Sequence, residues 1–290
     1  MKNFSLKKSF ALAKAEYIKW VCDARMLILA VLLVFIYSFA ITPLLENSKT
    51  MGQPLNILEP FIAIANSETL MLILPIVFLT LTADFPKIDT NTVFYIIRVG
   101  RTNWLVGQIL KLIFMVLSFL SVIFIGSVIP MLKDGFWYNG WSDVVTRFVW
   151  EYPEKSGNFG VTLLPENLYN QIDLFTAAIE SYLMVAGYLM ILGLILLGFS
   201  LIKRKTFGFV ASGALISFGT AFCTLKTNLM WTTPMANSVI WLHYTQYFSE
   251  PVMPMKFSVF YMLTFIAVLL VFCFVAIRKF NYDNVTEIAV

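Results

Sequence analysis

Few side chains in this sequence are of the types that carry out covalent or metal chemistry. The chain has one histidine, His243, and three cysteines, Cys22, Cys223 and Cys273. A single histidine excludes zinc sites built on paired histidines. Ser212, in the stretch VASGA, could act with His243 only if their side chains met, and we expect the two on opposite faces of a membrane. The sequence also lacks a G-x-x-x-x-G-K-[ST] motif, so it predicts no catalytic residue, no metal ligand and no ATP site in this chain.

The elements that hold these residues are long and apolar. Hydrophobic residues make up 59% of the chain and charged residues only 13%, about half the charged share of soluble domains. An α-helix needs about 20 apolar residues to cross a bilayer. Six stretches qualify: 26–45, 63–83, 107–132, 178–202, 207–225 and 257–277. The sequence therefore predicts an all-α integral membrane protein, with six transmembrane helices in a single domain over residues 1–290.

Basic residues are distributed unevenly between the segments that join these helices. With the N-terminus inside, the outer segments hold six of the 21 lysines and arginines, and the inner segments hold the other fifteen. Because basic residues are enriched on the cytoplasmic side, we expect both termini in the cytoplasm and the protein in a bacterial plasma membrane. Residues 1–25 and 84–106 are then cytoplasmic, and residues 133–175 and 226–256 are extracellular.

Residues 6–21 carry apolar side chains at helical spacing and lysines on the remaining surface. This pattern is typical of an amphipathic helix that lies on the inner leaflet before the first transmembrane helix. The alternative is a positively charged N-terminus that only sets the orientation of the chain.

Two carboxylates fall near the outer ends of predicted transmembrane helices. Residues 69–83 alone are too short to cross the bilayer, so we expect the second helix to continue outward, through Glu68, to Asn66. Glu180 lies similarly in the fourth helix. If the helices converge, Glu68, Glu180 and Lys226 line a hydrated pathway, because an unpaired charge in lipid is costly. The alternative is that both carboxylates reach the lipid headgroups and have no function.

Gly213, Ser217 and Ala221 recur every four residues along the predicted fifth transmembrane helix. Small residues at this spacing allow two helices to approach closely. We therefore expect this face to serve helix packing rather than a substrate path.

The two outer segments are rich in aromatic residues, and residues 133–175 also carry six acidic and three basic side chains. Loops of that length usually have a function or a structure of their own. Two interpretations of these segments remain: they form a lid or guide a substrate, or their aromatic residues form a belt at the outer membrane interface.

The cytoplasmic segment between the second and third transmembrane helices has the signals of a short helix. Asp89 can cap it, and Phe94 and Ile97 give it an apolar face. Arg98 falls in its last turn, and Gly100 stands where the chain must reverse with φ above zero. The apolar face has to be covered by the membrane or by the groove of a partner protein.

The stretch YIIRVGRTNWLVGQIL, in this same segment, resembles the loop after the second transmembrane helix of type-2 ABC-transporter permeases. In that family an Arg-x-Gly-Arg-x-x-Trp-like run forms part of the coupling helix, which sits on the ATP-binding subunit. The matching positions are Arg98, Gly100, Arg101, Trp104 and Gly107. The six-helix topology is similar too. Two features depart from the family: the outer segment after the third helix is longer, and the one before the last helix is more polar than a re-entrant helix pair.

The resemblance implies a type V ABC exporter-like fold and the permease subunit of an ATP-driven exporter, which itself is not an enzyme. The residues that would contact the ABC ATPase subunit are Asp89, Phe94, Ile97, Arg98, Gly100 and Arg101. ATP and Mg would be held by that subunit. A second permease copy or paralogue and membrane lipid are the other expected partners, and no nucleic acid is expected. The exported cargo would be an amphipathic peptide, lipid or drug.

An alternative from another class is a non-transporting membrane sensor or immunity protein. Such a protein would bind an extracellular ligand through its aromatic outer segments.

Overall fold

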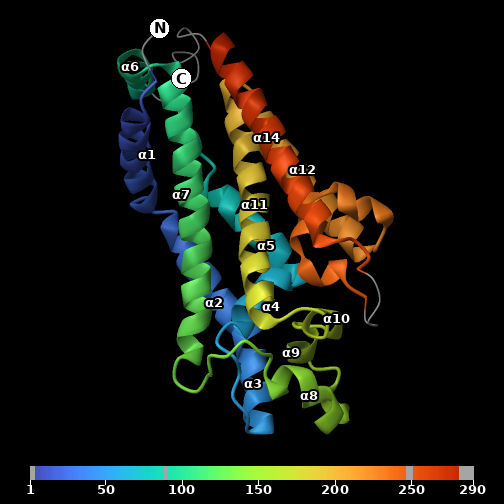
Figure 1. Ribbon diagram of the computed structural model, residues 1–290. Helices are drawn as coiled ribbons and strands as arrows, with labels where there is room; N and C mark the ends of the chain where they lie inside the picture. Colours follow the sequence, from blue (N-terminus) through green and yellow to red (C-terminus); the bar gives the residue numbers. More distant parts are fainter. Residues whose placement is uncertain (1–3, 88–89, 246–250, 281–290) are drawn as a thin grey trace.

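The computed structural model describes residues 4–87, 90–245 and 251–280, and within these ranges it contains helices, loops and no strand. The helices are α1 Leu6–Val21, α2 Met26–Ile36, the π-helix η1 Tyr37–Ile41, α3 Thr42–Met51, α4 Glu59–Asn66, α5 Glu68–Leu81, α6 Thr90–Val99, α7 Arg101–Val128, η2 Ile129–Met131, α8 Asp143–Glu151, η3 Pro153–Lys155, α9 Phe159–Thr162, α10 Glu166–Tyr169, α11 Leu174–Leu201, α12 Lys205–Thr224, η4 Asn228–Thr232, α13 Pro234–Ser238, η5 Ile240–His243 and α14 Met255–Lys279. Figure 1 shows α6 and the C-terminal end of α14 at one end of the molecule, and α3 with α8 to α10 at the other.

Five helical stretches are long and apolar enough to cross a membrane. They are Met26–Met51, Arg101–Met131, Leu174–Leu201, Lys205–Thr224 and Met255–Arg278. Each matches one of the predicted transmembrane stretches within a few residues. The all-helical, multi-pass character of the chain is therefore confirmed for these five.

The second predicted transmembrane helix is not continuous, so the expectation that it runs straight out to Asn66 is wrong. α4 and α5 meet at an angle of 80°, and together they form a sixth candidate, either a broken span or a re-entrant loop. Ser67 between them has an extended backbone, with φ −73° and ψ 125°. α5 alone has 14 residues, a length of about 21 Å.

Hydrogen bonds of Asn66 to distant segments stabilise this break. Its side chain donates to Ser181 Oγ (2.9 Å) and accepts from the Ile240 N–H (2.8 Å). Its carbonyl oxygen accepts from the indole N–H of Trp241 (2.9 Å). These bonds satisfy backbone and side-chain groups that the interrupted helix leaves without partners.

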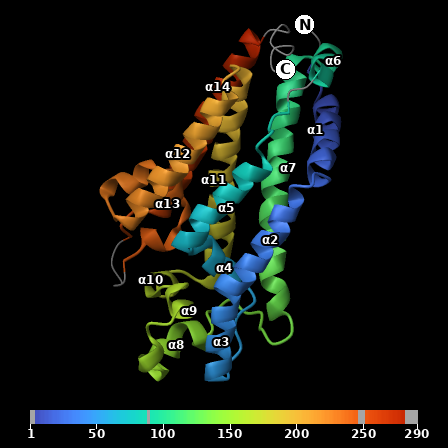
Figure 2. The same ribbon diagram turned by 180° about the vertical axis from the view of Figure 1, so that it is seen from behind.

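α11 lies at the centre of the bundle, between α7 and α14 (Figures 1 and 2). Apolar residues dominate most of its length, as expected for a helix surrounded by others. Glycines allow its neighbours to approach closely: Gly193 faces Leu112 of α7, and a Cβ on Gly198 would lie 2.7 Å from Phe272 of α14. The hydrophobic core is therefore built around this helix.

α1 confirms the predicted amphipathic N-terminal helix but not its expected orientation. It lies lengthwise along the first half of α7 and not across the end of the bundle (Figures 1 and 2). The rings of Phe10 and Tyr17 both pack edge-on against Phe114, with centroids 5.8 Å apart. α7 can offer this surface because its 28 residues extend over about 42 Å, well beyond the ~30 Å hydrocarbon core.

Residues 133–175 have a structure of their own, in which α8 and α9 pack beside α3 and α10 packs on α8 (Figure 1). Glu59, fully buried at the start of α4, joins this layer to the bundle. Its carboxyl oxygens accept from the Ser142 N–H (2.6 Å), the Ser142 hydroxyl (2.9 Å) and the Asn56 N–H (2.9 Å). Ser142 in turn caps α8 by accepting from the Val145 N–H.

Candidate functional site

α6 is the short helix that the sequence predicts before the third span, and it presents an apolar surface. Phe94 and Ile97 are 70% and 55% exposed, while Ile96 turns inward and is buried. Gly100 has φ 98°, which confirms the predicted reversal between α6 and α7. Arg98 is exposed beside these residues. Asp89 lies outside the described residues.

Arg101 and Trp104 join the start of α7 to the C-terminal end of α14 and to Phe280, which follows it. The Arg101 guanidinium donates to the carbonyl oxygen of Arg278 (3.3 Å). Trp104 is buried and stacks on Phe280, with ring centroids 6.3 Å apart. Two residues of the permease-like motif therefore make contacts within this chain.

Gly107, another motif residue, allows α1 to lie directly on α7. A Cβ at this position would lie 2.9 Å from Leu12 Cδ2 and 3.1 Å from the carbonyl oxygen of Ser9. One turn earlier, Asn103 Oδ1 accepts from the Ser5 N–H (2.8 Å). We call α6, α1 and the part of α7 that carries α1 the α6 junction.

Lys111 of α7 is a buried cation whose partner comes from α1. Its Nζ lies 3.5 Å from Glu16 Oε2, and also 5.5 Å from the ring centroid of Phe85. An isolated buried charge would be costly, so this pairing fixes the depth at which α1 packs. If the N-terminal segment served only to carry positive charge, it would not need the carboxylate of Glu16. The ion pair with Lys111 therefore favours a packed amphipathic helix over that alternative.

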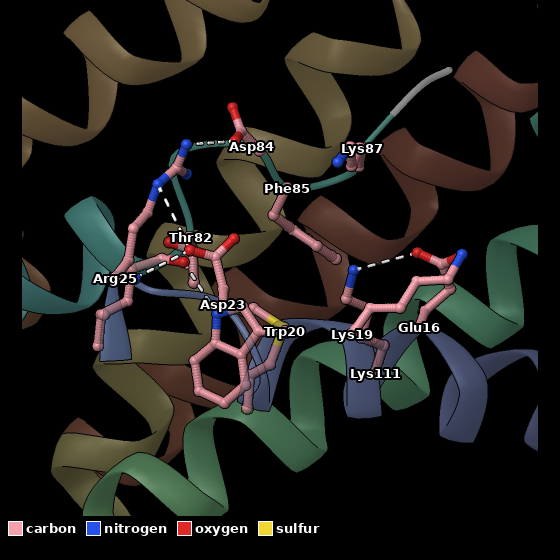
Figure 3. Close-up of a pocket in the computed structure, with 12 residues that line it drawn as sticks. Glu16, Lys19, Trp20, Asp23, Arg25, Thr82, Asp84, Phe85, Lys87 and Lys111 are labelled. Atoms are coloured by element: carbon pink, nitrogen blue, oxygen red, sulfur yellow. Dashed lines mark hydrogen bonds and ion pairs between the residues drawn. The ribbon is translucent and has the colours of Figure 1, made fainter. Parts of the chain in front are cut away.

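A pocket of about 100 Å³ opens beside this ion pair, between α1, α7 and the loop after α5 (Figure 3). Arg25 points across it to Asp84 (2.5 Å), and Lys205 at the start of α12 lies 3.5 Å from the same carboxylate. Burial raises the pKa of Asp84, but the hydrogen bond and charge of Arg25 and the charge of Lys205 outweigh it and lower that pKa overall. Trp20 completes the wall by donating its indole N–H to the Leu81 carbonyl (2.9 Å). α1, α7, the loop after α5 and the start of α12 thus converge at this pocket.

We expect Gly107→Ala to loosen α1 from α7. The added methyl group meets a backbone oxygen at 3.1 Å, and such overpacking typically costs about 1–3 kcal/mol. The midpoint of thermal unfolding of the purified protein should fall by several degrees. Gly187→Ala on α11 is the matched control, because its Cβ meets Met262 at an ordinary 3.9 Å. Equal midpoints for the two variants would contradict this account of the packing.

No ion pair joins the three charged residues of the predicted pathway within the described ranges, and their common pathway stays a prediction. Glu68 lines a cavity of about 300 Å³ at the break between α4 and α5, and Glu180 does not belong to its lining. Glu180 is half-buried, and its Oε2 has no hydrogen-bond partner within the described ranges. Lys226 is exposed and forms no ion pair with either carboxylate in the described part of the chain.

The small-residue face of α12 is open. A Cβ on Gly213 would meet nothing within 4 Å among the described residues, and Ser217 and Ala221 are exposed. Within the chain α12 packs through Gly208, against Phe199, and through Gly219, against Met235. The helix packing expected for this face has no partner helix among the described residues and stays a prediction.

A serine–histidine pair exists that the sequence did not reveal. Ser258 Oγ lies 2.8 Å from Nε2 of His243, and Nδ1 lies 3.1 Å from the Val239 carbonyl. Because a carbonyl only accepts, Nδ1 carries the proton and Nε2 accepts from the serine hydroxyl. Burial lowers the pKa of His243 to about 4. Both side chains are fully buried, and the pair joins η5 to α14.

Ser212, the serine considered from sequence, is buried, and its hydroxyl has no hydrogen-bond partner in the described ranges. The three cysteines are free, and no group of three or more His, Cys, Asp or Glu side chains within those ranges could hold a metal ion. Comparisons with family models, with curated proteins and with solved structures found no match to this chain.

Proposed function

We propose that this protein is the membrane-spanning subunit of an ATP-driven exporter of the type-2 ABC-transporter permease kind, and that α6 docks on an ABC ATPase subunit. The observation that carries the proposal is the pair of exposed apolar side chains on α6, Phe94 and Ile97, beside Arg98. A short helix with an uncovered apolar face is a typical binding element for a partner groove.

The contacts of the α6 junction supply a route from the ATPase to the transmembrane helices. Binding of ATP and Mg closes the ATPase subunits and moves α6. Gly100 passes the movement to α7, Arg101 passes it to α14 through Arg278, and α1 moves with α7 through its Glu16–Lys111 ion pair. Two permease copies, or this chain and a paralogue, form the pathway for an amphipathic cargo across the plasma membrane.

Purification of the tagged full-length chain from its native cells tests this function. We expect an ATPase subunit to co-purify in stoichiometric amount and its hydrolysis rate to rise when it is bound to the chain. Recovery of the chain from membranes without any ATPase, under conditions that preserve known ABC complexes, would contradict the proposal.

The proposed orientation has α6 and both termini inside the cell. In a variant without the native cysteines, Ser156→Cys, which lies just after η3, should react with an impermeant thiol reagent on intact cells. Lys8→Cys on α1 should react only after permeabilisation. Both positions are exposed, so the rest of the chain does not shield them from the reagent. Labelling of position 8 from outside intact cells would contradict this orientation and indicate the opposite one.

A membrane sensor or immunity protein is the second candidate, and the folded outer layer of α8, α9 and α10 favours it. An extracellular ligand could bind this layer without transport. Such a protein needs no ATPase, so the purification experiment separates the two functions.

A further inference from the structure

A cavity of about 300 Å³ lies at the break between α4 and α5. Asn66, Ser67, Glu68 and Thr69 form one wall, and Trp241 of η5 forms another. The outer segment contributes the remaining side, with Phe159, Thr162, Leu163 and Pro165. Its lining therefore combines one carboxylate, small polar groups, and aromatic and aliphatic surface.

The charge of this cavity is negative. Among the described residues, no lysine or arginine lines the cavity or lies within ion-pairing distance of Glu68. The C-terminal end of α4 and the N-terminal end of α5 have dipoles of opposite sign, which largely offset each other at the break. The carboxylate of Glu68 thus gives the cavity a preference for a cationic ligand. It is exposed to the cavity rather than neutralised by a neighbour.

The aromatic residues of the cavity favour the same kind of ligand. A cation over the face of a tryptophan or phenylalanine ring is attracted by about 0.5–1 kcal/mol at exposed sites. Trp241 and Phe159 supply such rings next to Glu68, and Leu163 and Pro165 supply apolar surface for a hydrocarbon chain. Residues 133–175, which form part of the wall, carry six acidic and three basic side chains.

We propose that this cavity binds the ammonium group of a cationic amphiphile, with Glu68 as its counter-charge. The inference rests on the proposed function in one respect only: if the chain is an exporter subunit, the cationic amphiphile is the class of cargo that it carries. Binding itself requires neither the ATPase nor ATP.

Photolabelling of the purified full-length chain tests the site directly. The probes are a diazirine-bearing dodecylamine and the matched diazirine-bearing dodecanol, which differ only in the charge of the head group. We expect the amine to label residues 66–69, 159–165 or Trp241, as mapped by mass spectrometry, and to do so more strongly than the alcohol. Glu68→Gln keeps the shape of the side chain and should lower amine labelling there about fivefold to tenfold, without changing labelling by the alcohol.

Glu46→Gln is the matched control, because Glu46 is also an exposed carboxylate and lies on α3, outside the cavity. It should leave both labelling patterns unchanged. Equal labelling of the cavity by amine and alcohol, or unchanged amine labelling in Glu68→Gln, would overturn the site. If the cavity fails this test but an ATPase subunit still co-purifies with the chain, the site is wrong and the exporter function is unaffected. If the amine labels the cavity as expected but no ATPase subunit co-purifies, the exporter function is wrong and the site is unaffected.

Discussion

Replacement of Phe94 and Ile97 together by glutamate should release the ATPase subunit while the permease chain stays folded. The two side chains are 70% and 55% exposed, so they contribute little to the core of this chain. Burial of each in a partner groove contributes about 1.5–3 kcal/mol, and loss of both should weaken the complex by more than about 100-fold. Co-purified ATPase, measured at matched expression, should fall to background.

Leu229→Glu provides the control for this double substitution. Leu229 is a similarly exposed apolar residue, at 58%, and it lies in η4 rather than in α6. That variant should retain the ATPase in full. Retention of the subunit by the Phe94 and Ile97 double variant, at the parental level, would exclude α6 as the docking element.

Glu59→Leu should destabilise the outer layer more than any other single change considered. Leucine fills a similar volume but leaves the N–H groups of Ser142 and Asn56 and the hydroxyl of Ser142 without their acceptor. Each buried donor left unpaired costs about 1–3 kcal/mol. We expect a loss of about 3–6 kcal/mol in the free energy of unfolding, together with rapid proteolysis within residues 133–173.

Glu46→Leu is the comparison for this change, because Glu46 is an exposed carboxylate on α3, the helix beside that layer. Its unfolding and its proteolysis should match those of the parent. If Glu59→Leu were as resistant to protease as Glu46→Leu, the hydrogen bonds of Glu59 would not hold the layer in place.

The sequence predicts the long helices well, because a run of about 20 apolar residues can adopt few structures in a membrane other than a transmembrane helix. The reversal at Gly100 is also readable, since only glycine adopts φ near 98° without strain. The break at Ser67 is not, because it depends on bonds from Asn66 to Ile240 and Trp241, more than 170 positions away.

Long-range pairing also explains the other differences. Lys111 falls inside a predicted transmembrane helix, and nothing local indicates that Glu16 of α1 neutralises it. The lengthwise packing of α1 follows from this pair and from the space left by Gly107. His243 and Ser258 lie on separate elements, 15 residues apart, with no spacing that marks them as partners.

Photocrosslinking from position 94 tests the central claim most directly. A benzoylphenylalanine placed at Phe94 in native membranes should crosslink to one protein that carries a P-loop, while the same group at Leu229 should not. Addition of ATP should change the yield of that crosslink, because α6 moves with the ATPase. Crosslinks from position 94 to lipid alone, or to a protein without a P-loop, would contradict the assignment of this chain as the permease of an ABC exporter.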